Sequence, residues 1–137
     1  MVRAIAVTTL VVFSAVPLYA TSCNVQHATV ATARGQVRWL AEGGVGPPVS
    51  GIPLTLSRQV AQDLRVVVND HADEQGRFAL PKLAKGLYVL RFGDAGRLGS
   101  IVIDLDPRSK NRWMWVDVGE RGDRPCSPTK AVAAEHE

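Results

Sequence analysis

The chain has 137 residues, a length that suits one domain of ordinary size. Hydrophobic residues make up 46% of it, a share that excludes a disordered chain, and charged residues make up 21%. The formal net charge of +3 is too small for a nucleic-acid binder that works through charge. The composition therefore predicts one globular domain with no nucleic-acid partner.

Residues 1–22 have the features of a secretory signal peptide. One charge, Arg3, precedes an apolar run that ends near Leu18, is shorter than a bilayer span and is followed by small residues. Cleavage after Ala20 and cleavage after Ser22 both fit the pattern. We therefore expect a periplasmic or extracellular protein, with a retained membrane anchor as an alternative.

The two cysteines, Cys23 and Cys126, lie near opposite ends of the mature chain. In an oxidising compartment an even pair usually forms a disulfide, which here would close a loop of about 100 residues and stabilise the fold by roughly 4–5 kcal/mol. Residues 20–23 (Ala-Thr-Ser-Cys) also resemble the bacterial lipoprotein signal, although Ala20 stands where leucine is usual. Lipidation of Cys23 would anchor the protein to a membrane and exclude the disulfide, so the two uses of Cys23 are alternatives.

From Arg34 to Gly119 the sequence consists of short alternating runs separated by glycine and proline, a pattern typical of a β-sandwich or barrel. A β-branched run, Arg65–Asn69, adds a further strand. The residues predicted to face the core are, in chain order, Val37 and Trp39; Ile52, Leu54 and Leu56; Phe78 and Leu80; Tyr88, Leu90 and Phe92; Ile101, Ile103 and Leu105; and Met114, Val116 and Val118.

Four segments are expected to lie outside these strands. Residues 42–48, rich in glycine and proline, are predicted to be an irregular loop. Residues 57–64 are the one stretch that could form a helical turn. Residues 23–33 are expected to be an N-terminal extension and residues 120–137 a tail, flexible beyond Cys126. The sequence therefore predicts one domain of about seven strands over residues 34–119.

Four motifs in order resemble carboxypeptidase regulatory-like domains. Residues 35–37 (Gly-Gln-Val) and 49–56 match the family's first two strands, residues 73–80 match its "T-D-x-x-G-R-F" turn, and residues 83–90 match its "L-x-x-G-x-Y-x-L" segment. The resemblance implies an all-β, seven-stranded Greek-key sandwich like that of transthyretin. It also implies an accessory module for recognition or folding that has no chemistry of its own.

The motif residues have physical reasons to occur where they do. Gly76 can adopt a positive φ in a tight turn, and the Asp73 carboxylate can bind backbone amides of the same turn. Gly86 lets the chain turn back into a strand. Tyr88 is predicted to bury its ring and to place its hydroxyl at an edge of the sheet.

Trp113, Trp115 and Asp117 form the candidate ligand site, because with a period of two they share one face of a strand. Asp117 should avoid the core, so both indoles are predicted to lie outside as a flat platform about 7 Å long, suited to sugar rings or peptide side chains. Two alternatives remain open. The N-terminal segment or the tail would cover the indoles, or the strand would face the other way.

Two further patterns give only weak evidence for a functional site. Asp70, His71, Asp73 and Glu74 gather in one turn, but their spacing matches no EF-hand, so a solvated turn is expected and no metal. Residues 121–123 spell Arg-Gly-Asp, a cell-adhesion tripeptide that arises often by chance.

No catalytic arrangement is apparent. His27, His71 and His136 are scattered, and no serine or cysteine lies in a nucleophile motif. The motifs of the transthyretin-like hydrolase of urate breakdown and of ring-cleaving dioxygenases are also absent. We therefore expect no enzyme and no cofactor, but a secreted β-sandwich that binds an unidentified protein partner. A carbohydrate-binding module that uses Trp113 and Trp115 is the alternative, and membrane contact is expected only if Cys23 is lipidated.

Overall fold

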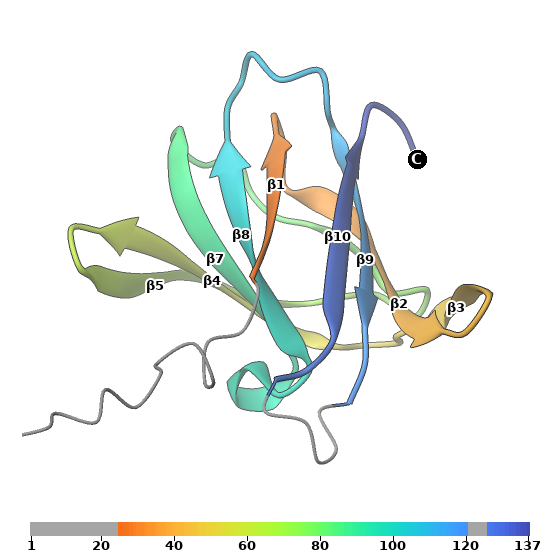
Figure 1. Cartoon of the computed structure of the whole chain (residues 1–137). Coiled ribbons are helices and arrows are strands. Elements are labelled where there is room, and N and C mark those ends of the chain that lie inside the picture. Colours follow the sequence, from red (N-terminus) through yellow and green to blue (C-terminus); the bar gives the residue numbers. More distant parts are fainter. Residues whose placement is uncertain (1–24, 121–125) are drawn as a thin grey trace, which may run out of the picture.

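Two β-sheets packed face to face make up the computed structural model, which describes residues 25–120 and 126–137 (Figure 1). A short 3-10 turn, η2 (Asp94–Gly96), is the one helical element among these residues. The same residues form ten strands: β1 (Gln26–Val30), β2 (Arg34–Ala41), β3 (Gly44–Pro48), β4 (Pro53–Val60), β5 (Asp63–His71), β6 (Arg77–Ala79), β7 (Gly86–Phe92), β8 (Gly99–Leu105), β9 (Trp113–Val118) and β10 (Thr129–Ala134).

The first sheet has the strand order β1-β8-β7-β4-β5, and the second has the order β10-β9-β2-β3, with β6 also paired to β2. Two pairs are parallel, β1 with β8 and β2 with β9, and the others are antiparallel. The predicted all-β sandwich is therefore confirmed. Its seven predicted strands are β2 and β4 to β9, and β1, β3 and β10 are additional.

Both ends of the described chain join the sheets, which corrects the predicted boundaries of 34–119. β1 lies in the segment expected to be an extension, and it buries Ala28 and Val30 against the core. β10 lies in the tail expected to be flexible beyond Cys126, and it pairs with β9 and buries Ala131. β1 has two apolar residues and β10 has mostly alanines, so each sequence gives a weak strand signal by itself.

Two local predictions are wrong. Residues 42–48 are not an irregular loop throughout, because β3 pairs with the end of β2 as an edge strand, where a missing proline donor is tolerated. Gly46 is required there, since a Cβ would collide with the Trp39 carbonyl oxygen. Residues 57–64 form no helical turn but the tip of the β4–β5 hairpin, where Ala61 has a φ of 56°.

The core lies between the two sheets and contains the residues predicted to face inward. The predicted residues of β7, β8 and β9 are all buried, and Trp39 packs half-buried against the same core. Tyr88 is 1% exposed, in agreement with the prediction that its ring is buried. Its hydroxyl donates a hydrogen bond to the Ala84 carbonyl at 2.6 Å.

The turn before β6 also follows the prediction. Gly76 has a φ of 73°, and the Asp73 carboxylate accepts hydrogen bonds from the amides of Gln75 at 2.9 Å and Arg77 at 2.8 Å. The Gly76 carbonyl accepts a bond from the Val37 amide at 2.8 Å. The turn is therefore fixed both by its own aspartate and by β2.

Candidate functional site

The tryptophan pair lies on the outer face of the second sheet. Met114, Val116 and Val118 of β9 are each 0% exposed and point into the core, so the alternate residues of this strand point away from it. The predicted orientation of β9 is thereby confirmed. The alternative in which this strand faces the other way is excluded.

The flat platform predicted from Trp113 and Trp115 does not form. Their ring centroids are 5.6 Å apart, but the rings meet at 67°, edge to face. Trp113 is only 4% exposed, and Arg34 of β2 lies over its ring with Cζ 5.9 Å from the centroid. Arg38 lies closer over Trp115, at 4.6 Å. Cation–π contacts and T-shaped packing are favourable for indoles, so the rings pack against arginines and each other instead of lying open.

The Asp117 carboxylate is also bound by an arginine of β2. Its Oδ1 accepts a charged hydrogen bond from Arg38 Nε at 3.2 Å, and the two side chains are 20% and 16% exposed. Arg38 therefore binds the carboxylate while it stacks on Trp115. The three predicted site residues do lie together, but they form a closed contact with β2.

The C-terminal strand flanks the same row from the other side. Val132 of β10 is opposite Trp115, and Ala134 is opposite Trp113. The last residue, Glu137, forms an ion pair with Arg77 at 3.7 Å and shares a hollow with Trp113. Part of the tail thus lies against Trp113, as one of the alternatives weighed from the sequence expected, while Trp115 stays partly exposed.

The edge strand β5 of the first sheet has three exposed large apolar side chains, more than any other described strand. β5 pairs with β4 alone, and Figure 1 shows this hairpin projecting from the body of the sandwich. Val66 is 58% exposed, and Leu64 and Val67 are 44% and 42% exposed. Sequence reasoning placed the strand but missed its exposure. The signal was the lack of alternation in its β-branched run, which leaves no clearly inward face.

Another register feature marks the same hairpin. Leu56 pairs with Val68 and the next residue, Ser57, pairs with Val66, so Val67 is an extra residue in the strand, a β-bulge. Bulges increase the local twist and turn an edge strand out of the plane of its sheet. The bulge therefore fits the projection of the hairpin.

The acidic turn is a structural element in the described chain. Asp73 binds amides of its own turn, and Asp70 Oδ1 accepts a hydrogen bond from the His71 amide at 2.7 Å. Residues 25–120 and 126–137 contain no group of three His, Cys, Asp or Glu side chains that could hold a metal ion.

Several predictions fall on segments outside the described residues: the signal peptide at residues 1–22, Cys23, and the Arg-Gly-Asp tripeptide at residues 121–123. Cys126 is described and is not a free thiol. The Cys23–Cys126 disulfide stays a prediction, as does lipidation of Cys23. In the part of the chain that is described, no helix has the length and hydropathy needed to cross a membrane.

The two sheets and their order define a transthyretin-like β-sandwich. Sea bream transthyretin in complex with thyroxine superimposes with a TM-score of 0.55 and 14% identity, over 76% of this chain and 97% of that one. Transthyretin from Sparus aurata superimposes with a TM-score of 0.53 and 15% identity, over 74% and 96%. No family model and no curated protein matches the sequence. These likenesses establish the fold alone.

Proposed function

We propose that the protein is a secreted, non-enzymatic module of the carboxypeptidase regulatory-like type that binds a protein partner by strand addition at β5. It works in the periplasm or outside the cell. The observation that carries the proposal is that β5 pairs with β4 on one side only, within the described residues. The other side of such a strand has backbone donors and acceptors available for another strand.

The side chains of β5 fit the same role. Val66 and Val67 are exposed β-branched residues, which pack well against cross-strand neighbours. Charged residues lie at both ends of the strand, with Asp63 and Arg65 at the start and Asp70 near the finish. Charges at an edge discourage indiscriminate pairing, so a partner strand with complementary charges is selected.

A site-specific cross-link tests this proposal. A photo-reactive phenylalanine analogue replaces Val66 in the full chain, and the matched control carries it at Val132, which is 48% exposed on the other sheet. The cross-linked species is then isolated from cells of the natural host. We expect a partner that is captured from Val66, is not captured from Val132, and is lost when Leu64→Lys is added.

Hydrogen exchange of the captured complex gives the second readout. Strand addition protects the amides of β5 on its free side, so their exchange slows when the partner binds. Equal capture from both positions, or unchanged exchange in β5, would refute strand addition at this edge.

A carbohydrate-binding module remains the second candidate, favoured by one observation. Trp115 is partly exposed on an outer sheet face with Gln36 opposite it on β2, so a sugar would meet part of an indole and a side-chain amide. The buried ring of Trp113 leaves less stacking area than the predicted platform. Fluorescence titration with cell-wall and storage glycans tests it, and a response that Trp115→Leu leaves unchanged would count against it.

A further inference from the structure

One end of the sandwich carries a hollow of about 420 Å³, lined by residues that follow the ends of β1, β6 and β8. Figure 1 shows the ends of β1 and β8 at its top. Three connections meet there, those between β1 and β2, between β6 and β7, and between β8 and β9. The volume falls within the range of small-ligand sites. None of the residues that line this hollow belongs to β5 or to the tryptophan pair.

The floor of the hollow is apolar. Leu80 and Leu105 are 8% and 4% exposed and belong to the core, and Leu83 packs half-buried against it. Proline rings at Pro81 and Pro107 continue the apolar wall. A ligand with a hydrocarbon body would cover this surface and remove it from water.

The rim is cationic. Arg34, Lys82 and Arg112 line the hollow, all three are exposed, and no carboxylate is among its lining residues. The ion pairs found in the described residues involve other cations, Arg38, Arg77 and Arg108. Three cations around one opening make a local positive potential that favours an anionic group.

Two carboxylates approach the rim from outside the hollow. Glu135 and Glu137 share a neighbouring hollow with Arg34 and Arg112, so the arginines stand between the two spaces. Lys82 lines the first hollow but not the second, so it does not share a hollow with these two glutamates. The rim therefore keeps an excess of positive charge toward the apolar floor.

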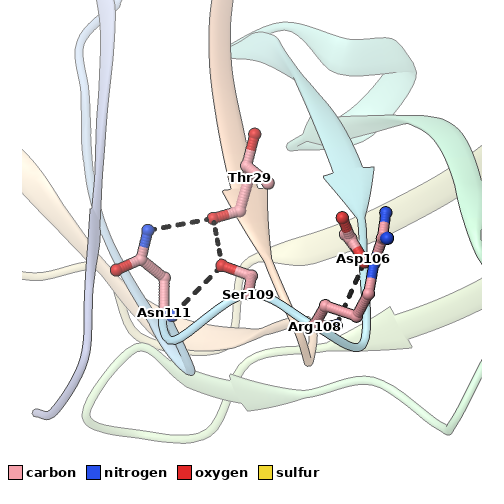
Figure 2. Close-up of polar contacts among 5 residues, drawn as sticks. All are labelled: Thr29, Asp106, Arg108, Ser109 and Asn111. Atoms are coloured by element: carbon pink, nitrogen blue, oxygen red, sulfur yellow. Dashed lines mark hydrogen bonds and ion pairs between the residues drawn. The ribbon is translucent and has the colours of Figure 1, made fainter.

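The loop that presents Arg112 is fixed by hydrogen bonds, which Figure 2 shows. The Thr29 carbonyl accepts bonds from Asn111 Nδ2 at 3.2 Å and from Ser109 Oγ at 3.5 Å, and the Asn111 amide donates to Ser109 Oγ at 3.1 Å. In the same loop Asp106 Oδ1 accepts bonds from Arg108, so its charge is already paired. Because this loop is already ordered, it loses less conformational entropy when a ligand binds.

We propose that this hollow binds a small amphipathic acid, a molecule with one anionic group on a short apolar body. The anion accepts charge-assisted hydrogen bonds from the arginine and lysine rim, while the body covers Leu83 and Leu105. An inorganic anion would leave the floor exposed to water, and a neutral apolar molecule would leave the cations without a partner. The site is separate from the β5 edge and does not depend on the function proposed there.

Three probes test the proposal with the mature full chain: octanoate, 1-octanol and inorganic sulfate, each followed by backbone amide NMR shifts. Octanoate should shift the amides of Leu83 and Arg112, and should bind at least about tenfold more tightly than either 1-octanol or sulfate. Arg112→Gln and Lys82→Gln should each weaken octanoate binding by about tenfold. Lys110→Gln is the matched control, because Lys110 is exposed in the same loop but outside the hollow, and it should change nothing.

The outcomes against the proposal are equally definite. Octanoate that shifts no amide around the hollow, or that binds no better than 1-octanol or sulfate, would overturn it. So would an affinity reduced equally by Lys110→Gln and Arg112→Gln, since binding would then follow net charge. Unfolding curves and amide spectra of the glutamine variants verify that each remains folded, and these exposed positions leave the core intact.

Discussion

The turn before β6 offers the sharpest test of how this sandwich is fixed, through Gly76→Ala. Gly76 has a φ of 73°, which an L residue adopts at a cost of about 1–2 kcal/mol. A Cβ there would also collide with the Val37 carbonyl oxygen and crowd the backbone of Val49. Gly51→Ala is the matched control, because Gly51 has a φ of 63° and open space around its Cβ position.

The magnitudes follow from these contacts. Alanine regains about 0.4–1 kcal/mol by restricting the unfolded chain, so Gly51→Ala should cost only about 0.5–1 kcal/mol. At Gly76 the collision must displace the turn from β2. That displacement disturbs two hydrogen bonds, from the Val37 amide to the Gly76 carbonyl at 2.8 Å and from the Val49 amide to the Val37 carbonyl at 2.9 Å. With each hydrogen bond worth about 1 kcal/mol, Gly76→Ala should lower the free energy of unfolding by about 3 kcal/mol.

Urea unfolding followed by tryptophan fluorescence measures both variants under the same conditions. The expected order is wild type, Gly51→Ala, then Gly76→Ala, with the last two separated by about 2 kcal/mol and with equal slopes. If Gly76→Ala fell within about 0.5 kcal/mol of Gly51→Ala, the close approach to β2 would not be contributing to stability, and the reasoning from the Cβ collision would be refuted.

Three further predictions concern side chains. Arg38→Gln should cost about 1–2 kcal/mol in urea unfolding, because it removes both the bond to Asp117 and the stack on an indole, and Asp117→Asn should cost less; an equal loss would mean that the stack contributes nothing. Tyr88→Phe should cost about 1 kcal/mol by removing a buried hydroxyl bond, and an unchanged unfolding midpoint would contradict this. Hydrogen bonds from the backbone and then the side chain of Arg108 lower the pKa of Asp106, so the stabilisation is present above the unfolded-state pKa and is lost as pH falls through the folded-state pKa. Asp106→Asn should therefore remove part of the acid sensitivity of the unfolding midpoint as the pH falls below the usual aspartate pKa of about 3.9, and an identical pH profile would contradict the assignment.

The sequence predicted the strands whose apolar residues alternate within one run. Leu90, Ile103 and Val116 stand at the centres of such runs, and all three are 0% exposed. β1 escaped prediction because it has only two apolar residues, and β10 because its apolar residues are mostly small alanines; each strand is held in place by a neighbour that is distant in the sequence or outside its own apolar run. β3 escaped because glycine and proline, which normally break strands, are tolerated at an edge.

The candidate site was predicted in part for a similar reason. Alternation along β9 correctly assigned Trp113 and Trp115 to the outer face. Their ring orientation depends on Arg34 and Arg38, which β2 brings alongside by parallel pairing, and nothing within β9 encodes that contact. The hollow at the end of the sandwich could not be foreseen either, since three separate connections build it.

The parallel pairing of β1 with β8 has a mechanical consequence. A force applied at the start of β1 runs along the strand, while its hydrogen bonds to β8 run across it. All five residue pairs, from Gln26 with Ile101 to Val30 with Leu105, are then loaded together in shear instead of opening one after another. A chain held at the start of β1 and pulled from the end of β8 would therefore be resisted by all five pairs at once.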